Sequence, residues 1–389
     1  MKKIICIIFL SVFVFPVNVF AQAPEEISLE EQLETLKNLE TELEEISGQL
    51  DEFSQPIDTS NVGSEEVRAR ITEISFDEIV DDNRQMVFTA EADGMKYIVD
   101  TRVSLLEGLR HNLHVGDEVY LQVIQKDGSV TSVFLIDVVR TTNLFWLAVL
   151  FSLVIIVIGR WRGVASLAGL VITFVVLFAL IVPSILAGKD PVFITIIGSL
   201  IILAVNMHLS HGFNKGTLYA FGSTVIGLAL VWVFSNAFVA FAKLTGLASE
   251  EAILLQFHSE TVSAPAGILL AAIILGAVGV LDDIAITQSE TVAELREANP
   301  NLHQKELFTA AMRIGRHHIA STVNTLVLAY AGVALPLLLL FVHTQGVDVF
   351  RFLNEELVAE EIIRTLAGTL ALVLTVPIST WLATYLNKR

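Results

Sequence analysis

Cysteine is nearly absent from this chain of 389 residues, since Cys6 is the only one. Cys6 lies in the N-terminal apolar stretch, so the remainder of the chain has no disulfide, no thiolate metal site and no cysteine nucleophile. The sequence also contains no HExxH, GxSxG or P-loop pattern, and no nucleophile at a recognisable spacing from a base. We therefore expect a protein that is not an enzyme and that needs no cofactor.

Charged side chains are scarce as well. They make up 17% of the residues, compared with about a quarter in ordinary soluble domains. Apolar residues account for 53%, and the mean hydropathy is +0.66. Apolar runs of roughly 18 residues or more recur after residue 142, and each is long enough to cross a lipid bilayer. These features predict an α-helical polytopic membrane protein.

Basic residues are outnumbered, with 24 Lys and Arg against 42 Asp and Glu. The excess is concentrated in residues 24–142, which carry 27 acidic and 9 basic side chains, a net charge of −18. Such a region will not favour nucleic acid as a partner. A solvated acidic surface is the favoured interpretation, and attraction of cations or basic partners is the alternative.

Residues 1–23 have the three parts of a secretory signal peptide. Lys2 and Lys3 form a basic start, residues 4–20 form an apolar core, and Ala21-Gln-Ala23 is a small-x-small cleavage signature. An uncleaved membrane anchor is the alternative. In either case the segment that follows is expected outside the cytoplasm.

Residues 24–62 contain an acidic segment with a heptad pattern. Two interpretations remain open for Leu29–Phe53: a coiled coil that joins copies of the chain or a protein partner, and a helix that packs on the chain's own β domain. The apolar positions of the pattern are Leu29, Leu36, Leu39, Leu43, Ile46, Leu50 and Phe53.

Residues 63–142 change to a period of two, typical of β-strands. Val67, Ala69 and Ile71 alternate with polar residues, and Asp93-Gly94 and Asp127-Gly128 are hairpin turn signals. About five strands fit a small barrel of the OB or SH3 type. Because this region lacks a basic face, a structural or partner-binding role is favoured over nucleic-acid binding.

Residues 143–389 are expected to form a domain of about seven transmembrane helices. With the N-terminus outside, the cytoplasmic loops carry nine basic residues and the outer side of this domain carries four, in agreement with the positive-inside rule. We predict a multi-pass protein of the bacterial cytoplasmic (inner) membrane, with its N-terminal domain extracytoplasmic and its C-terminus inside. The expected spans are Asn143–Gly159, Val164–Leu186, Val192–Leu209, Thr217–Ala242, Pro265–Thr287, Thr322–Val342 and Ile362–Leu386.

Asp282 and Asp283 are the main polar residues within the predicted spans. At about 1.5 Å per residue, Asp282 lies about 25 Å along a helix that starts at Pro265. Charges at such depth are costly, and adjacent carboxylates repel each other, so the pair is a candidate proton relay. An interfacial anchor that faces the cytoplasm is the alternative. Gly276 and Gly279 precede the pair and allow close helix approach.

Several polar residues are candidate partners of this pair. Glu290 follows it on the same helix, and either Arg316 or His317 is positioned to pair with Asp282 or Asp283. Asn324 lies deeper and is expected to hydrogen-bond to a neighbouring helix. Asn206 and His208 close the third span on the same side. Two histidines at i and i+3, His208 and His211, are too few for a metal site, and we predict none.

The chain resembles the YibE/F-like membrane proteins. The resemblance rests on the segment from Gly279 to Asp283, on the run from Met312 to Gly332, and on the order of signal segment, small β domain and helices. It covers nearly the whole chain and is best from Ala266 to Pro377. It implies a multi-pass membrane architecture but brings no established activity.

The segment from Gly279 to Glu290, followed by an Arg-rich helix and a span ending at Pro336, is similar to part of the resistance-nodulation-division exporters. That resemblance implies that Asp282 and Asp283 relay protons. Two functional hypotheses result: a proton-coupled transporter or exporter, and a non-enzymatic membrane protein for assembly or partner binding.

Overall fold

A computed structural model describes residues 62–80, 83–101, 113–126, 129–258, 264–343 and 348–385. The chain divides into two compact units, Met1–Leu150 and Phe151–Arg389. The predicted signal peptide, the heptad segment Leu29–Phe53 and the Asp127-Gly128 turn lie outside the described residues, so those predictions stay predictions.

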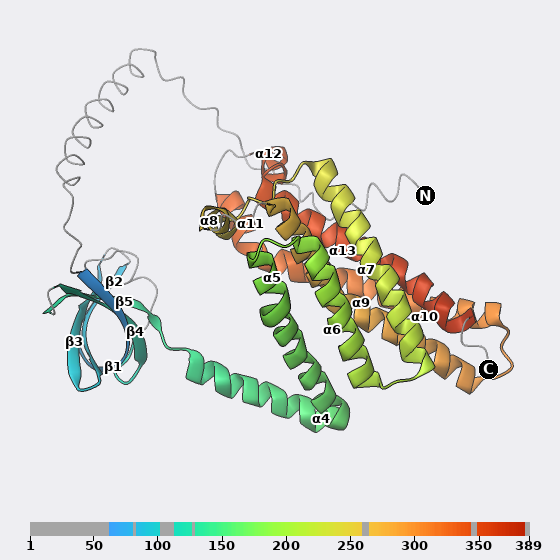
Figure 1. The fold of residues 1–389 in the computed structure, drawn as a ribbon, viewed down its shortest axis with the longest axis horizontal. Helices are drawn as coiled ribbons and strands as arrows, with labels where there is room; N and C mark the ends of the chain where they lie inside the picture. The colour runs from blue at the N-terminus through green and yellow to red at the C-terminus, as the bar shows by residue number, and fades with distance from the viewer. Residues whose placement is uncertain are drawn as a thin grey trace, which may run out of the picture. The chain divides into compact units, whose positions relative to one another are not determined.

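Five antiparallel strands make up the first unit, in the order β3-β2-β1-β4-β5. The first half of β1 pairs with β4 and the second half pairs with β2, with register shifts after Ile71 and Ile74. Such irregularities bend a strand, and the sheet curls until β3 approaches β5 (Figure 1). The predicted barrel is therefore a curled half-barrel. Its strands are β1 (Val62–Val80), β2 (Asn83–Ala92), β3 (Met95–Asp100), β4 (Glu118–Lys126) and β5 (Ser129–Val138).

Alternating side chains fill the concave face of this sheet, as the period of two requires. Ile71, Phe88 and Leu121 are almost fully buried within one hydrophobic cluster. At the β2–β3 hairpin both Asp93 (φ 49°) and Gly94 (φ 78°) have positive φ. This is the conformation of a type I′ turn, which Asp-Gly favours, so the turn predicted at these residues is confirmed.

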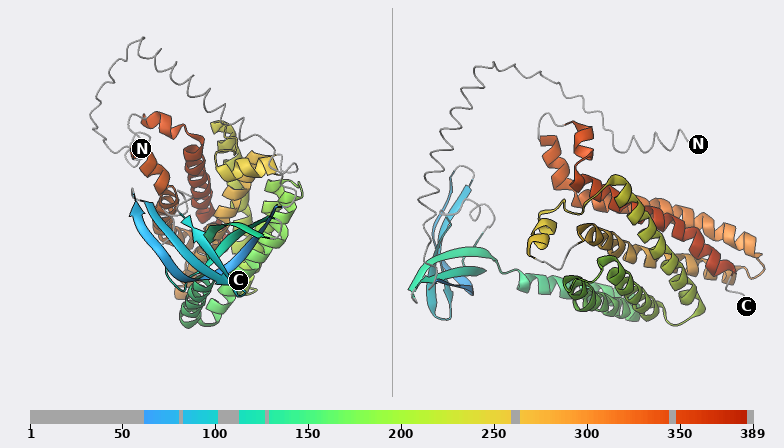
Figure 2. Two further views of the ribbon diagram at one scale, coloured as in Figure 1. Left: turned by 90° about the vertical axis from the view of Figure 1, so that its left-hand side faces the viewer. Right: turned by 45° about the horizontal axis from the view of Figure 1, so that its top comes forward.

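The second unit is helical, and helix α4 leads into it. Three helices, α7, α9 and α13, pack on one another at its centre; α6 lies against α9 and α7, and α10 lies against α13 and α9 (Figures 1 and 2). The helices are α4 (Thr141–Val176), η2 (Leu177–Ile181, a π-helical segment), α5 (Val182–Leu186), α6 (Pro191–His211), α7 (Lys215–Ala242), α8 (Glu250–His258), α9 (Pro265–Ala298), α10 (Gln304–Val333), α11 (Leu335–His343), α12 (Val349–Leu353) and α13 (Glu356–Tyr385).

Five helices in the described residues are long and apolar enough to cross a membrane, or six if α10 and α11 form one broken span. These two helices are bent by 59° relative to each other, and Pro336 near the break removes a backbone donor. A membrane protein is therefore supported, with fewer separate spans than the seven expected from the sequence.

The difference lies in the first candidate span, Thr141–Leu186, which counts as one helix of 46 residues. At 1.5 Å per residue it would be about 69 Å long, more than twice the thickness of the hydrocarbon layer. Arg160 interrupts it with non-helical angles (φ 51°, ψ −130°). A Cβ at Gly163 would lie 2.3 Å from the carbonyl oxygen of Ile155, so the chain turns back tightly where only glycine fits.

Candidate functional site

The ends of the helical unit are defined by contacts between helices. At one end, here called the proline end, Pro191 lies beside Gly267, Gly246 lies against Pro265, and Thr245 contacts Glu356. At the other, the histidine end, His211 Nδ1 lies 3.1 Å from Glu290 Oε1, and Ser289 donates a hydrogen bond to the carbonyl oxygen of Gly216 (3.0 Å).

These contacts give the depth of Asp282 in the helical unit. Pro265 and Ser289 are 24 residues apart, about 36 Å along α9, which is slightly longer than the hydrocarbon layer is thick. Asp282 is seven residues before Ser289, so it lies about 10 Å from the histidine end. That position is within the apolar part of the bundle.

Asp282 is partly buried, and its Oδ1 is buried with no hydrogen-bond partner among the described residues. The nearest charge acting on it from another helix is that of His211 on α6. A buried carboxylate oxygen without a donor costs free energy, and a proton is one way to remove that cost. Asp282 therefore has the environment of a proton-accepting group.

Asp283 faces α10, where it meets His318. Asp283 Oδ2 lies 3.9 Å from His318 Nε2, a separation beyond hydrogen-bond length. Asp283 is 65% exposed and His318 is 29% exposed. The two side chains are therefore near neighbours that make no direct hydrogen bond.

Gln288 lies at the point where α9, α10 and α13 meet. It is fully buried, its Oε1 accepts a hydrogen bond from Thr380 Oγ1 (2.9 Å), and its Nε2 has no partner among the described residues. Three residues after Asp282, toward the histidine end, the carbonyl oxygen of Ala285 accepts a hydrogen bond from Ser379 (3.0 Å). These bonds hold α9 and α13 together near the carboxylates and fix the backbone that presents them.

One face of α9 carries only small residues and a carboxylate. Ala272, Gly276, Gly279 and Asp283 are spaced by four, three and four, and all are exposed. A Cβ at Gly279 would meet nothing within 4 Å. We call these four residues the open face of α9. The open space is at Gly279, one turn before Asp283, while the Tyr330 hydroxyl lies beside Gly276.

The other predicted partners lie apart from this pair. Arg316, His317 and Asn324 are all exposed on α10, and none has an ion pair with the carboxylates among the described residues. The pairing predicted for Arg316 or His317 is made instead by the neighbouring His318. Glu290 contacts His211 rather than either aspartate.

Asn206 and His208 face other helices. Asn206 Nδ2 donates a hydrogen bond to Thr173 Oγ1 on α4 (3.1 Å), and its Oδ1 would clash with a Cβ at Gly169. His208 Nδ1 lies 2.7 Å from the carbonyl oxygen of Ala204, and its ring centroid is 4.7 Å from that of Phe213. No group of three or more His, Cys, Asp or Glu in the described residues could hold a metal ion.

Two residues of the site differ from the expectation based on sequence. Arg316 or His317 was expected to pair with the aspartates, but His318 is the residue that lies near Asp283, because the rotation of α10 decides which histidine faces α9. Gln288 was not singled out, since it lies among polar neighbours in what reads as the polar end of the helix.

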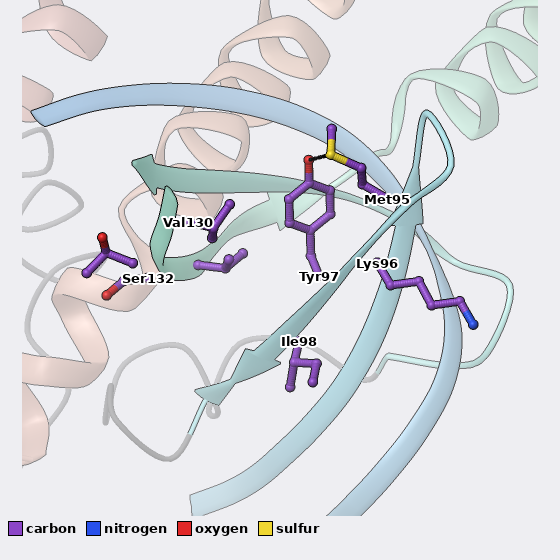
Figure 3. Close-up of a pocket in the computed structure, with 8 residues that line it drawn as sticks. Met95, Lys96, Tyr97, Ile98, Val130 and Ser132 are labelled. Atoms are coloured by element: carbon purple, nitrogen blue, oxygen red, sulfur yellow. Dashed lines mark hydrogen bonds between the residues drawn. The ribbon is translucent and has the colours of Figure 1, made fainter. Parts of the chain in front are cut away.

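The β unit has a separate pocket of about 480 Å³ between its edge strands β3 and β5. Figure 3 shows Tyr97 in this pocket, with its hydroxyl 4.0 Å from the sulfur of Met95. Among the described lining residues only Lys96 is charged. The pocket therefore combines apolar side chains with the hydroxyls of Tyr97, Thr131 and Ser132 at the strand edges.

A bundle of long apolar helices joined in sequence to a small curled β-sheet defines a multi-pass membrane protein with an accessory β domain. Residues 147–389, more than half of the chain, match the sequence model of the YibE/F-like proteins. The chain belongs to the YibE/F-like family. No curated protein and no solved structure matches it.

Replacement of Gly315 by alanine is expected to loosen the site. The new Cβ would lie 2.9 Å from Val376 Cγ1 and 3.0 Å from the amide oxygen and nitrogen of Gln288. Overpacking of this kind costs about 1–3 kcal/mol, so thermal unfolding of the detergent-purified variant should occur at lower temperature. Gly332→Ala on the same helix, where nothing lies within 4 Å, is the control and should not be destabilised.

Proposed function

We propose that this protein is a proton-coupled transporter and not an enzyme. The observation that carries the proposal is Asp282, a carboxylate about 10 Å inside the bundle whose Oδ1 is buried without a hydrogen-bond donor. Carboxylates at such depth are costly and are typical of ion and proton pathways. The local similarity to resistance-nodulation-division exporters agrees with this role.

In this mechanism the proton binds to Asp282 and leaves toward the histidine end. His211 and Glu290 lie at that end, and Asp283 lies near His318 of α10. Carboxylates and histidines both exchange protons near neutral pH when their surroundings change. Protonation of Asp282 removes a charge from the bundle, which lowers the cost of moving α9 against its neighbours.

The open face of α9 is the proposed surface for the transported molecule. It is the one face of this helix where small residues leave space, and it ends at Asp283. A solute held there would contact the carboxylate whose partner His318 is already within 3.9 Å. Proton binding and solute binding would then act on adjacent residues, which is what coupling between them requires.

The orientation that we propose places the histidine end in the cytoplasm and the β domain outside. The break at Arg160 supports counting Thr141–Leu186 as two spans, which together with the broken α10–α11 span makes seven. An odd number places the two ends of the membrane domain on opposite sides. The signal-peptide pattern and the distribution of basic residues support an outer N-terminus in a bacterial cytoplasmic membrane.

Asp282→Asn should abolish coupled transport. Wild-type protein is placed in liposomes loaded with the pH dye pyranine. Organic cations, organic anions and metal salts are then added in turn, and at least one of these classes should drive proton movement across the liposome membrane. The variant should reduce that signal by about 10-fold or more, as expected for loss of a relay group. Glu297→Gln, an exposed carboxylate near the end of the same helix and outside the proposed pathway, should retain most of it. Equal proton movement in the wild type and in Asp282→Asn would contradict a proton relay at Asp282.

Single cysteines can test the orientation, since Cys6 is the only natural one. In a Cys6→Ser background, a membrane-impermeant maleimide should label Lys189→Cys and Lys243→Cys in intact cells. Arg162→Cys and Lys305→Cys should react only after permeabilisation, because they face the cytoplasm in the proposed seven-span topology. Labelling of Arg162→Cys from outside would contradict the turn at Arg160 and hence the count of seven.

A second candidate function, assembly with another copy of the chain, is favoured by α10. Away from the histidine end, its exposed face carries the polar residues Ser321, Asn324 and Thr325, for which lipid would be a poor solvent. The amide of Asn324 has both donors and an acceptor, so it can bond to the same residue across a two-fold axis. The exposed residues of this face are Arg313, Arg316, His317, Ser321, Asn324 and Thr325.

Asn324→Cys should therefore form a disulfide-linked dimer in native membranes on mild oxidation, in the Cys6→Ser background. Phe241→Cys on α7, which is 90% exposed but apolar, is the matched control and should stay monomeric. Equal cross-linking at the two positions would indicate random collision, and absence of a dimer at Asn324→Cys would argue against a shared α10 interface.

A further inference from the structure

A second polar cluster lies at the proline end, where α13 begins. Glu356 caps the loop after α7: its Oε1 accepts hydrogen bonds from the hydroxyl of Thr245 (2.8 Å), from the Gly246 N–H (3.1 Å) and from the Thr245 N–H. One turn later stands Glu360, which is only 7% exposed. Glu356 Oε1 is thus hydrogen-bonded to the loop, whereas Glu360 is buried within the bundle.

Glu360 is incompletely paired. Its Oε1 is buried with no hydrogen-bond partner in the part of the chain that the structure describes. Its carboxylate interacts with the backbone N–H of Ala248, and the charged groups that act on it are Glu356, Glu361 and Arg364 of its own helix. Two of these three are negative, so the surroundings of Glu360 are not those of a neutralised ion pair.

Arg364 is already engaged by another residue. Its Nη1 donates a hydrogen bond to Glu361 Oε1 (2.7 Å), and both side chains are mostly buried. Glu361 Oε2 and Arg364 Nε are, like Glu360 Oε1, buried without a partner among the described residues. Glu360, Glu361 and Arg364 together carry one negative charge in excess when both carboxyl groups are ionised, and Glu356 adds a second negative charge nearby.

A polar side chain of α10, Tyr330, lies farther into the bundle than this cluster. The charges of Glu361 and Arg364 act on Tyr330, and the Tyr330 hydroxyl lies 3.6 Å from the position of a Cβ at Gly276 on the open face of α9. Glu360 is about 6 Å from the start of α13, and Gly276 is about 16 Å from the start of α9. Polar groups therefore continue from the proline end to the middle of the helix that carries Asp282.

We propose that Glu360 binds an exchangeable proton at the proline end and is the second proton-accepting carboxyl of the bundle, opposite Asp282. A metal cation would need several oxygen ligands, and the guanidinium of Arg364 repels it. A proton needs no cage and removes the excess charge from the low-dielectric interior. The inference rests on the proposed transport function, to which it adds the site of proton entry on the outer side.

The test is chemical labelling of the full-length protein. Dicyclohexylcarbodiimide reacts with protonated carboxyl groups in apolar surroundings, and peptide mass spectrometry locates each adduct. In detergent and in liposomes, Glu360 should be labelled, with about 10-fold more adduct near pH 5 than near pH 9 because only the protonated form reacts. Excess sodium chloride should leave the yield unchanged.

Variants separate this residue from its neighbours. Glu360→Gln should remove the adduct from its peptide and leave any adduct at Asp282 in place. Glu355→Gln, an exposed carboxylate just before α13 and outside this cluster, is the control and should leave labelling of Glu360 intact. The wild-type peptide map decides the question even if a variant fails to fold.

Two outcomes would overturn the inference: no adduct at Glu360 at any pH, or protection of Glu360 by sodium, which would indicate a metal-ion site. Neither outcome touches the proposed function, which depends on Asp282 and is measured by proton movement. The opposite combination is also informative. If Glu360 is labelled but the Asp282→Asn variant transports normally, the proton site at Glu360 stands and the relay role of Asp282 is rejected.

Discussion

Burial of polar side chains among apolar helices is the constraint on which the arrangement of the helical unit depends. Hydrocarbon offers no hydrogen bonds, so each polar group on α9 must find a partner on another helix or remain costly. Near the histidine end, Ser379 and Thr380 of α13 meet that requirement by donating hydrogen bonds to Ala285 and Gln288 of α9. Asp282 and Glu360 each keep a buried oxygen without a donor among the described residues. Several neutral side chains, such as Ser199 and Ser235, also keep a buried polar atom without a partner there, but an ionised carboxylate is the costliest group to leave in that state.

Small residues set how closely the helices approach. Because Gly315 has no side chain, Gln288 fits between α9 and α10. Gly227 of α7 likewise leaves room for Thr375 of α13 and Leu281 of α9. Where a glycine has no neighbour, as at Gly279, the same lack of a side chain leaves space instead. Glycine therefore has two roles in one helix bundle: it brings the central helices together and it opens one face of α9 beside Asp283.

Asp282 and Glu360 lie near opposite ends of the bundle. Asp282 has His211 of a neighbouring helix acting on it, whereas Glu360 has Arg364 and two further glutamates on its own helix. The two environments therefore differ in chemistry. Asp282 and Glu360 both lie within residues 147–389, the region that matches the YibE/F-like family.

The sequence by itself determined the membrane character, the β-strands and their Asp93-Gly94 turn, and the presence of two carboxylates within an apolar helix, because hydropathy, a period of two and a charge in an apolar run are local properties. It did not determine which histidine meets Asp283, or that Asn206 and His208 face other helices. It also did not single out Glu360, which looks like one of several acidic residues before the last span. Those facts depend on helix rotation and on contacts between residues far apart in sequence, and only the tertiary structure decides them.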